Sequence, residues 1–178
     1  MLSSFKNKLR HLILSEHSRT MADTVVNEIG DDEERFKALM DLLSEGDYRL
    51  TQRAAWPLAL ISDKRPAFIT PYIHDLILKL KEPAHPALHR NIVRILQGIE
   101  IPSEEQGVLA DACFLFLYHN ETPIATKCFS ISVLHNICLK EPDLAKEICL
   151  YIEERISFES AAFKSRGRKF LAYWGNNL

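Results

Sequence analysis

The sequence predicts an all-α protein, because its apolar residues follow the period of a helix. They recur at intervals of three and four along nearly the whole chain, as in residues 68–80. No segment alternates strictly between apolar and polar residues, as a β-strand would. Short polar or Pro-containing connections predict that consecutive helices run antiparallel, as about five pairs. The predicted helices cover residues 3–16, 20–29, 32–45, 48–62, 67–81, 86–99, 103–119, 122–138, 142–156 and 159–174.

Several of these helices begin with residues that favour a helix start. Ser103 and Gln106 have the spacing of a capping box. Pro86 and Pro123 stand at the first helical position, where a missing N–H group costs nothing. Pro57 lies inside the predicted helix 48–62 and predicts a kink there, which would tilt the neighbouring Trp56.

A basic residue recurs every 37 residues in the first turns of the second helix of each pair. A two-helix repeat of this length indicates an α-solenoid, in which successive pairs stack side by side. We therefore predict a right-handed α–α superhelix that forms a single domain over residues 1–178. The recurring bases are Arg53, Arg90, Lys127 and Lys164, the repeats are predicted at 31–62, 66–99, 103–138 and 141–174, and a capping helix pair is predicted at 1–30.

These segments resemble the armadillo/HEAT repeat family, as a short member of bacterial type. HEAT-like units carry an acid near the turn between their helices and a base six residues later, and Asp47 and Arg53 have that spacing, as do Glu121 and Lys127. The other two repeats have alanine and phenylalanine in place of the acid. The resemblance covers residues 31–174, and it implies that each base bridges the turn acid of its own repeat or of the next one.

The charge of the chain is balanced overall and uneven locally. Twenty-four acids and 22 bases give a net charge of -2, so no overall attraction for nucleic acid or anionic membranes is expected. Residues 23–47 contain nine acids and two bases, whereas residues 160–178 contain four bases and no acid. The acidic run at 31–34 predicts the first turn of a helix. Its alternative role is to dock a basic partner or the basic end of another copy, in weak head-to-tail association; otherwise we expect a monomer.

Several functional classes are not expected from this sequence. Charged residues interrupt the first 18 positions, so we expect no signal peptide or membrane span and a cytoplasmic location. His85 and His89 lack further metal ligands nearby, and six scattered glycines form no phosphate-binding loop, so we predict neither metal nor cofactor. Four cysteines without a CxxC pair are predicted to be reduced core residues: Cys113, Cys128, Cys138 and Cys149.

The candidate binding surface is the concave wall, which second helices form in repeat proteins of this kind. Bases there have two possible roles: they hold the frame together through internal pairs, or they present a positive stripe to phosphates or to an acidic protein segment. Trp56 is either a core residue or a stacking platform. The candidate residues are Arg53, Trp56, Arg90, Asn91, Arg94, Lys127, Lys164 and Arg168, with Arg49, Arg166 and Lys169 as further exposed bases.

Two hypotheses for the function follow. The first is a non-enzymatic binding module that holds a segment of an unidentified protein partner. The alternative is a DNA-binding protein or enzyme, since some bacterial DNA alkylation-repair glycosylases are built from HEAT-like repeats; however, no catalytic acid can be matched here. A loose helical similarity to adenylosuccinate lyase implies no activity, because the mobile signature loop of that family is missing.

Overall fold

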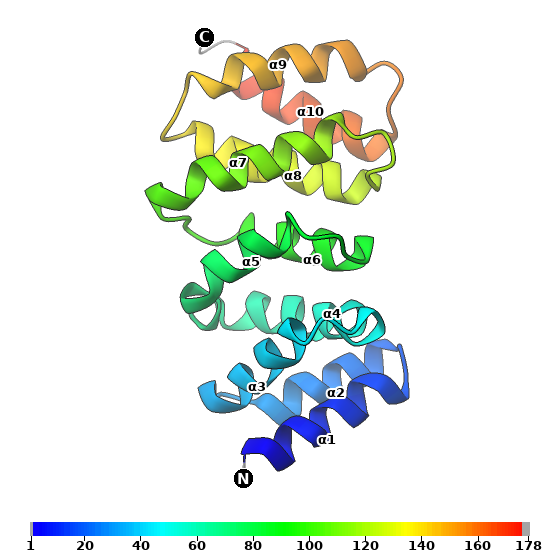
Figure 1. Cartoon of the computed structure of the whole chain (residues 1–178). Helices are drawn as coiled ribbons and strands as arrows, with labels where there is room; N and C mark the ends of the chain where they lie inside the picture. The colour runs from blue at the N-terminus through cyan, green and yellow to red at the C-terminus, as the bar shows by residue number, and fades with distance from the viewer. Residues whose placement is uncertain (1, 176–178) are drawn as a thin grey trace. The chain divides into compact units, whose positions relative to one another are not determined.

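The computed structural model describes residues 2–175, and over this range the chain consists of α-helices, two 3-10 turns and no β-strand (Figure 1). The predicted all-α class is therefore confirmed. The elements are α1 (Leu2–Ser15), α2 (Arg19–Ile29), α3 (Glu33–Ser44), α4 (Tyr48–Lys64), η1 (Pro66–Phe68), η2 (Thr70–Tyr72), α5 (Ile73–Lys79), α6 (Pro86–Leu96), α7 (Ser103–Tyr118), α8 (Ile124–Cys138), α9 (Leu144–Arg155) and α10 (Ala161–Trp174).

The chain divides into two compact units, Met1–Ile99 and Glu100–Leu178, here called unit 1 and unit 2. The boundary falls between the repeats predicted at 66–99 and 103–138. Unit 1 thus contains the predicted capping pair and two repeats, and unit 2 contains the other two repeats. The assignment of residues 1–178 to a single domain stays a prediction.

The predicted helix 67–81 differs from the structure, because its first half forms two 3-10 turns. Pro71 has no N–H group to donate to the carbonyl four residues earlier, so a regular helix cannot run through this position without losing a bond. The chain forms tighter bonds instead: the N–H of Ile69 donates to Pro66 O at 3.0 Å, and the N–H of Tyr72 donates to Ile69 O at 2.8 Å. Regular helix begins only at Ile73.

In unit 1 the helices α2, α4 and α6, which follow the first helix of each pair, pack against one another in order. We call these and α8 and α10 the second helices, and α1, α3, α5, α7 and α9 the first helices. Fully buried side chains fill the core of unit 1, including Leu39, Leu50, Leu58 and Ile61. The helix α4 continues through Pro57 as far as Lys64.

In unit 2 the helix α8 packs against α7, α9 and α10, and α9 packs against α10. Gly167 lets α9 and α10 approach closely, since a Cβ atom there would lie 2.8 Å from Cγ2 of Ile152. On the same side of α10, Phe163, Phe170 and Trp174 are buried. Within each unit, therefore, positions 37 residues apart lie on neighbouring second helices: Arg53 and Arg90 in unit 1, Lys127 and Lys164 in unit 2.

Candidate binding surface on the second helices

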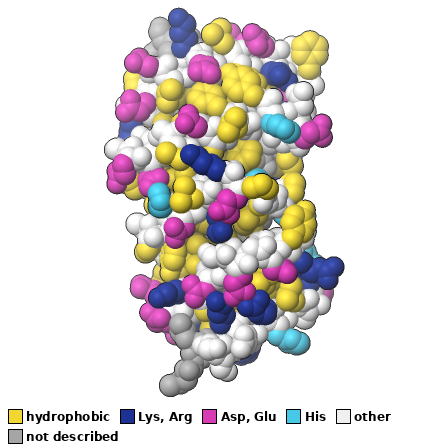
Figure 2. Space-filling view, in the orientation of Figure 1, with side chains coloured by type: hydrophobic (Ala, Val, Ile, Leu, Met, Phe, Trp, Pro, Cys, Tyr) yellow, Lys and Arg dark blue, Asp and Glu magenta, His cyan; other side chains and the backbone are white. Residues whose placement is uncertain are grey.

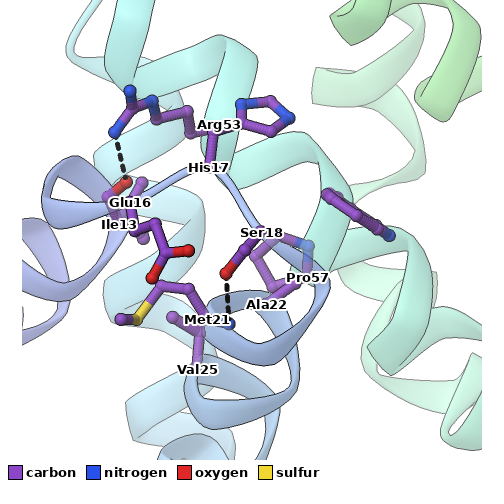
Figure 3. Close-up of a pocket in the computed structure, with 10 residues that line it drawn as sticks. Ile13, Glu16, His17, Ser18, Met21, Ala22, Val25, Arg53 and Pro57 are labelled. Atoms are coloured by element: carbon purple, nitrogen blue, oxygen red, sulfur yellow. Dashed lines mark hydrogen bonds between the residues drawn. The ribbon is translucent and has the colours of Figure 1, made fainter.

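Arg53 stabilises the end of a neighbouring helix. Its Nη1 donates hydrogen bonds to two backbone carbonyls at the C-terminal end of α1, to Leu14 O at 2.7 Å and to Ile13 O at 3.4 Å. Figure 3 shows Arg53 reaching from α4 towards this end of α1. The last carbonyls of a helix have no partner within the helix, and a cation there also opposes the negative end of the helix dipole. Arg53 thus acts as a cap supplied from another repeat.

The pairing of Asp47 with Arg53 that the resemblance implied is not what the structure shows. Asp47 caps its own helix, because its Oδ1 accepts a hydrogen bond from the N–H of Leu50 at 2.6 Å. A helix start offers several unpaired N–H groups, so a carboxylate at this position is satisfied locally. Arg53 finds its acceptors on α1, about 40 residues earlier in the sequence.

Trp56 lies half-buried at a small pocket in unit 1, which also includes Arg53. The ring of His17 lies 5.7 Å from the Trp56 ring, so one side of the indole is already covered. The pocket volume is about 240 Å³, including space open to solvent. The lining residues, shown in Figure 3, are Ile13, Glu16, His17, Ser18, Met21, Ala22, Val25, Arg53, Trp56 and Pro57.

The three candidates on α6 occupy different environments. Arg90 is exposed on the surface. Arg94 donates through Nη2 to Oδ2 of Asp63 at 2.7 Å, which ties α6 to the end of α4. Asn91 is 6% exposed, and its Nδ2 donates to Ala87 O at 2.9 Å. The prediction that Asn91 binds a partner is therefore corrected, because a buried amide that bonds its own helix is not accessible to a partner.

Lys127 is the second correction to the predicted surface. Its side chain is only 5% exposed, and its Nζ lies 3.9 Å from Oε1 of Glu159, whose side chain is 17% exposed. Glu159 directly precedes the capping residue of α10, so Lys127 bridges the turn acid of the next repeat, as the resemblance implied. The acid stands one position after the site at which it was expected. This base holds two repeats together and is not available at the surface.

The helix α10 differs from the other second helices, because it carries four bases and no acid. Lys164 and Arg166 are half-buried, and Arg168 and Lys169 are exposed. None of the four forms an ion pair within residues 2–175. In this part of the chain, α10 therefore carries a charge that the protein does not itself neutralise.

The bases of α10 lie along two edges of the helix. Arg166 is close enough to α8 to oppose the burial that raises the pKa of the Cys128 thiol. Tyr173, seven residues later on the same face, places its ring 5.0 Å from that of His135 on α8. Lys169 lies between them on this edge. Lys164 and Arg168, one turn apart, lie along the other edge, away from α8.

The acidic segment 23–47 is largely neutralised within unit 1. Asp31 pairs with Arg65, and Lys8 lies 2.6 Å from Glu28. Glu45 pairs with Lys6 and Arg10, and the hydrogen bond from Lys6 lowers the pKa of this exposed carboxyl. The run 31–34 also starts a helix as predicted, because Asp32 caps α3 and two glutamates occupy its first turn. Most of this acidity is thus engaged internally.

The histidines and cysteines considered as metal or redox sites have structural environments instead. His85 Nδ1 accepts a hydrogen bond from the N–H of Ala87, and His89 Nε2 bonds with Glu82 O. All four cysteines are unpaired and buried, and burial raises the pKa of Cys113 and of Cys138 to about 12. Among residues 2–175, no cluster of three or more His, Cys, Asp or Glu could hold a metal ion. Nor does that range contain a helix long and apolar enough to cross a membrane.

Comparison with protein families agrees with this arrangement of paired helices. A sequence profile of the HEAT repeat domain matches residues 5–172. The chain belongs to the HEAT repeat family. The resemblance found in the sequence is confirmed, and so is the α-solenoid class of fold that accompanies it. No curated protein matches the sequence of this HEAT repeat chain.

Proposed function

We propose that this HEAT repeat protein is a non-enzymatic binding module that holds an acidic protein segment against its second helices. HEAT repeats generally serve as scaffolds rather than as enzymes, since stacked helix pairs offer long surfaces for a partner. The proposal uses those residues of the predicted set that reach the surface. In unit 1 these are Arg90 and Trp56, and in unit 2 they are Lys164 and Arg168, with Arg166 and Lys169 beside them.

The observation that carries the proposal is the unneutralised charge of α10. Three of the other candidate bases have internal roles: Arg53 caps α1, Arg94 pairs with Asp63, and Lys127 is buried beside Glu159. The four bases of α10 have no such role among the described residues. Carboxylates of a partner would complete their interactions, and guanidinium groups bind carboxylates with two parallel hydrogen bonds.

A short acidic segment fits this site better than duplex DNA does. The bases occupy a single helix of 14 residues, which is about 21 Å long. Tight binding of duplex DNA uses basic side chains that contact many phosphates over a longer surface. Unit 2 as a whole contains eight basic and eleven acidic residues, so its net charge is negative. This charge repels the parts of a long polyanion that extend beyond α10.

Fluorescence anisotropy with a fluorescein-labelled, glutamate-rich peptide tests the proposal. We expect binding at low salt that weakens as screening increases. Reversing two exposed charges in Arg168→Glu/Lys169→Glu should reduce the affinity at least about tenfold. Lys37→Glu/Lys81→Glu is the matched control, because it changes the net charge equally at two exposed positions of unit 1. This control should bind nearly as tightly as the unmodified chain.

Two results would contradict the proposal. One is equal loss of affinity in both variants, which would show that only net charge matters. The other is tighter binding of a labelled duplex DNA than of the peptide, with the affinity lost in the α10 variant. That second result would favour the DNA-binding alternative instead.

A further inference from the structure

The outward face of α7 and α9 in unit 2 exposes large apolar side chains. Leu115 on α7 is 68% exposed, and Leu150 on α9 is 54% exposed. Figure 2 shows hydrophobic side chains gathered over these two helices, with acidic side chains around them. Exposed apolar side chains that form a contiguous patch can mark an interaction surface.

Side-chain contacts hold the two leucines on one surface. Tyr118 of α7 packs edge-on against Tyr151 of α9, with 5.0 Å between ring centroids, and its hydroxyl donates to Oε1 of Glu147 at 3.1 Å. Leu115 lies one turn before Tyr118, and Leu150 lies one turn after Glu147. Residues three or four apart share a helix face, so both leucines flank the same junction between α7 and α9.

Acidic residues surround these leucines. Asp111, Glu147, Glu153 and Glu154 lie on the exposed sides of the two helices, and none of them forms an ion pair with another described residue. Two bases on α9 accompany them: the exposed Lys146, and Arg155, whose guanidinium lies 5.5 Å from the centre of the Tyr151 ring. We call this surface the α7–α9 face. It is apolar at its centre and acidic in balance.

A second copy of the chain offers a complementary surface at α10. The four bases there lack internal partners, and Phe158, which precedes the helix, is 90% exposed. We infer that α10 of one copy docks on the α7–α9 face of another, with bases against acids and Phe158 against the exposed leucines. This inference rests on the proposed function in one respect: both require the α10 bases to be available to carboxylates.

Such a contact joins two different surfaces, so it is heterologous rather than a symmetric contact of one surface with its own copy. The buried side of α9 includes Ile152, which faces Gly167 of α10, and its exposed side carries Leu150. The α7–α9 face and the exposed side of α10 thus point away from each other within unit 2. In each complex one copy still has a free α10 and the other a free α7–α9 face, so association proceeds head to tail. The acidic surface is on α7 and α9, whereas the sequence pointed to the run 31–34.

Sedimentation velocity of the full chain tests the inference. We expect the average mass to rise with protein concentration at low salt and to return to the monomer at high salt. Variant A, Arg168→Glu/Lys169→Glu, keeps an intact acidic face, and variant B, Glu153→Lys/Glu154→Lys, keeps an intact basic helix. Each should lose self-association by at least about tenfold. The control Lys37→Glu/Lys81→Glu should associate as the unmodified chain does.

Mixing the two variants gives the most specific result. The acidic face of variant A remains complementary to the basic helix of variant B, so an equimolar mixture should associate although neither variant associates alone. A chain that combines all four substitutions exchanges the two charges and should regain self-association. Near-native circular dichroism of each variant would confirm that loss of association is not loss of folding.

The inference is overturned if the unmodified chain stays monomeric at every concentration, or if variants A and B associate as it does. It is also overturned if the mixture of A and B stays monomeric. These failures are distinguishable from failure of the proposed function, because peptide binding is measured separately at concentrations at which the chain is monomeric. A monomer whose α10 still binds the acidic peptide would refute self-association and leave the proposed function intact.

Discussion

Units 1 and 2 use their charged residues in different ways. In unit 1, bases from α1, α2 and α3 and the linking residue Arg65 pair with the acids of residues 23–47, and Arg53 caps a helix end. In unit 2 the bases collect on α10 and the acids on α7 and α9, while Lys127 pairs with Glu159 and Lys140 pairs with Glu100. Unit 1 thus neutralises most of its charges internally, whereas unit 2 keeps most of its bases and acids on different helices.

The comparison shows that a base at a fixed repeat position has no fixed role. Arg53, Arg90, Lys127 and Lys164 are 37 residues apart in turn. One caps a helix, one is exposed, one is buried against an acid and one is half-buried without an ion pair in the described chain. The role follows from the acceptor within reach, which differs between neighbouring repeats. Stability measurements on single variants can therefore separate frame residues from surface residues.

The largest effect is expected at Lys127, the frame residue of unit 2. Lys127→Ala leaves the carboxylate of Glu159 partly buried without a partner and also removes a buried aliphatic stem, so the free energy of unfolding should fall by about 3 kcal/mol. Urea unfolding followed by circular dichroism measures this. The control Lys127→Met keeps most of the volume and should cost less. An unchanged midpoint for Lys127→Ala would mean that the pair does not hold the repeats together.

A smaller loss is expected at Arg53. Arg53→Met removes two hydrogen bonds from a charged donor to carbonyls of α1 and should lower the free energy of unfolding by about 2 kcal/mol. Trp56, in the same helix, reports the transition in a Trp174→Phe background. Arg49→Met, on the exposed side of α4, is the matched control and should change stability by less than about 0.5 kcal/mol. Equal effects at the two arginines would refute the capping role.

A pH effect is expected in unit 2, where Trp174 Nε1 donates to Nδ1 of His135 at 3.0 Å. Burial lowers the pKa of His135 below its ordinary value of 6.5. Between its folded and unfolded pKa values, His135 binds more protons in the unfolded chain than in the folded chain. Its contribution to the free energy of unfolding is therefore fully present above about pH 6.5 and is lost as the pH falls through this range.

Fluorescence of Trp174 in a Trp56→Phe background measures this dependence. The slope of unfolding free energy against pH between 7 and 5 should decrease in His135→Gln. The exposed His119 serves as the control position for the same substitution, His119→Gln. A slope that is the same in all three proteins would show that His135 does not couple to folding.

The smallest effect is expected at the exposed pair of Arg94 and Asp63. Their side chains are 32% and 51% exposed, so solvent screens the interaction, and a double-mutant cycle with alanine should give a coupling of less than about 1 kcal/mol. The coupling should decrease with added salt. A value of several kcal/mol would place Arg94 among the frame residues, beside Lys127.

Helix positions were predictable from the sequence because apolar spacing records which side of a helix is buried. The exception was 67–81, where Pro71 changes the local hydrogen bonding within an apolar pattern that looks continuous. The 37-residue spacing also predicted which helices lie next to each other within a unit. These features depend on local spacing, which a single sequence contains.

The partners of individual charges were not predictable in the same way. Arg53 bonds backbone carbonyls, which every residue has, so no sequence signal marks its acceptor. Glu159 stands one position away from its expected place. The exposure of Leu115 was hidden as well, because apolar residues occur on all sides of α7 and give no preferred face. Such features depend on how the repeats pack.

Binding of an acidic segment at α10 requires that the bases of α10 are available to carboxylates, whereas those of the frame are not. Carbodiimide coupling of the glutamate-rich peptide to the chain, followed by mass spectrometry, tests it directly, because only lysines next to a bound carboxylate form an amide. Coupling concentrated at Lys164 and Lys169 is the predicted result. Coupling spread over Lys37, Lys64, Lys81 and Lys146, or confined to unit 1, would contradict the account.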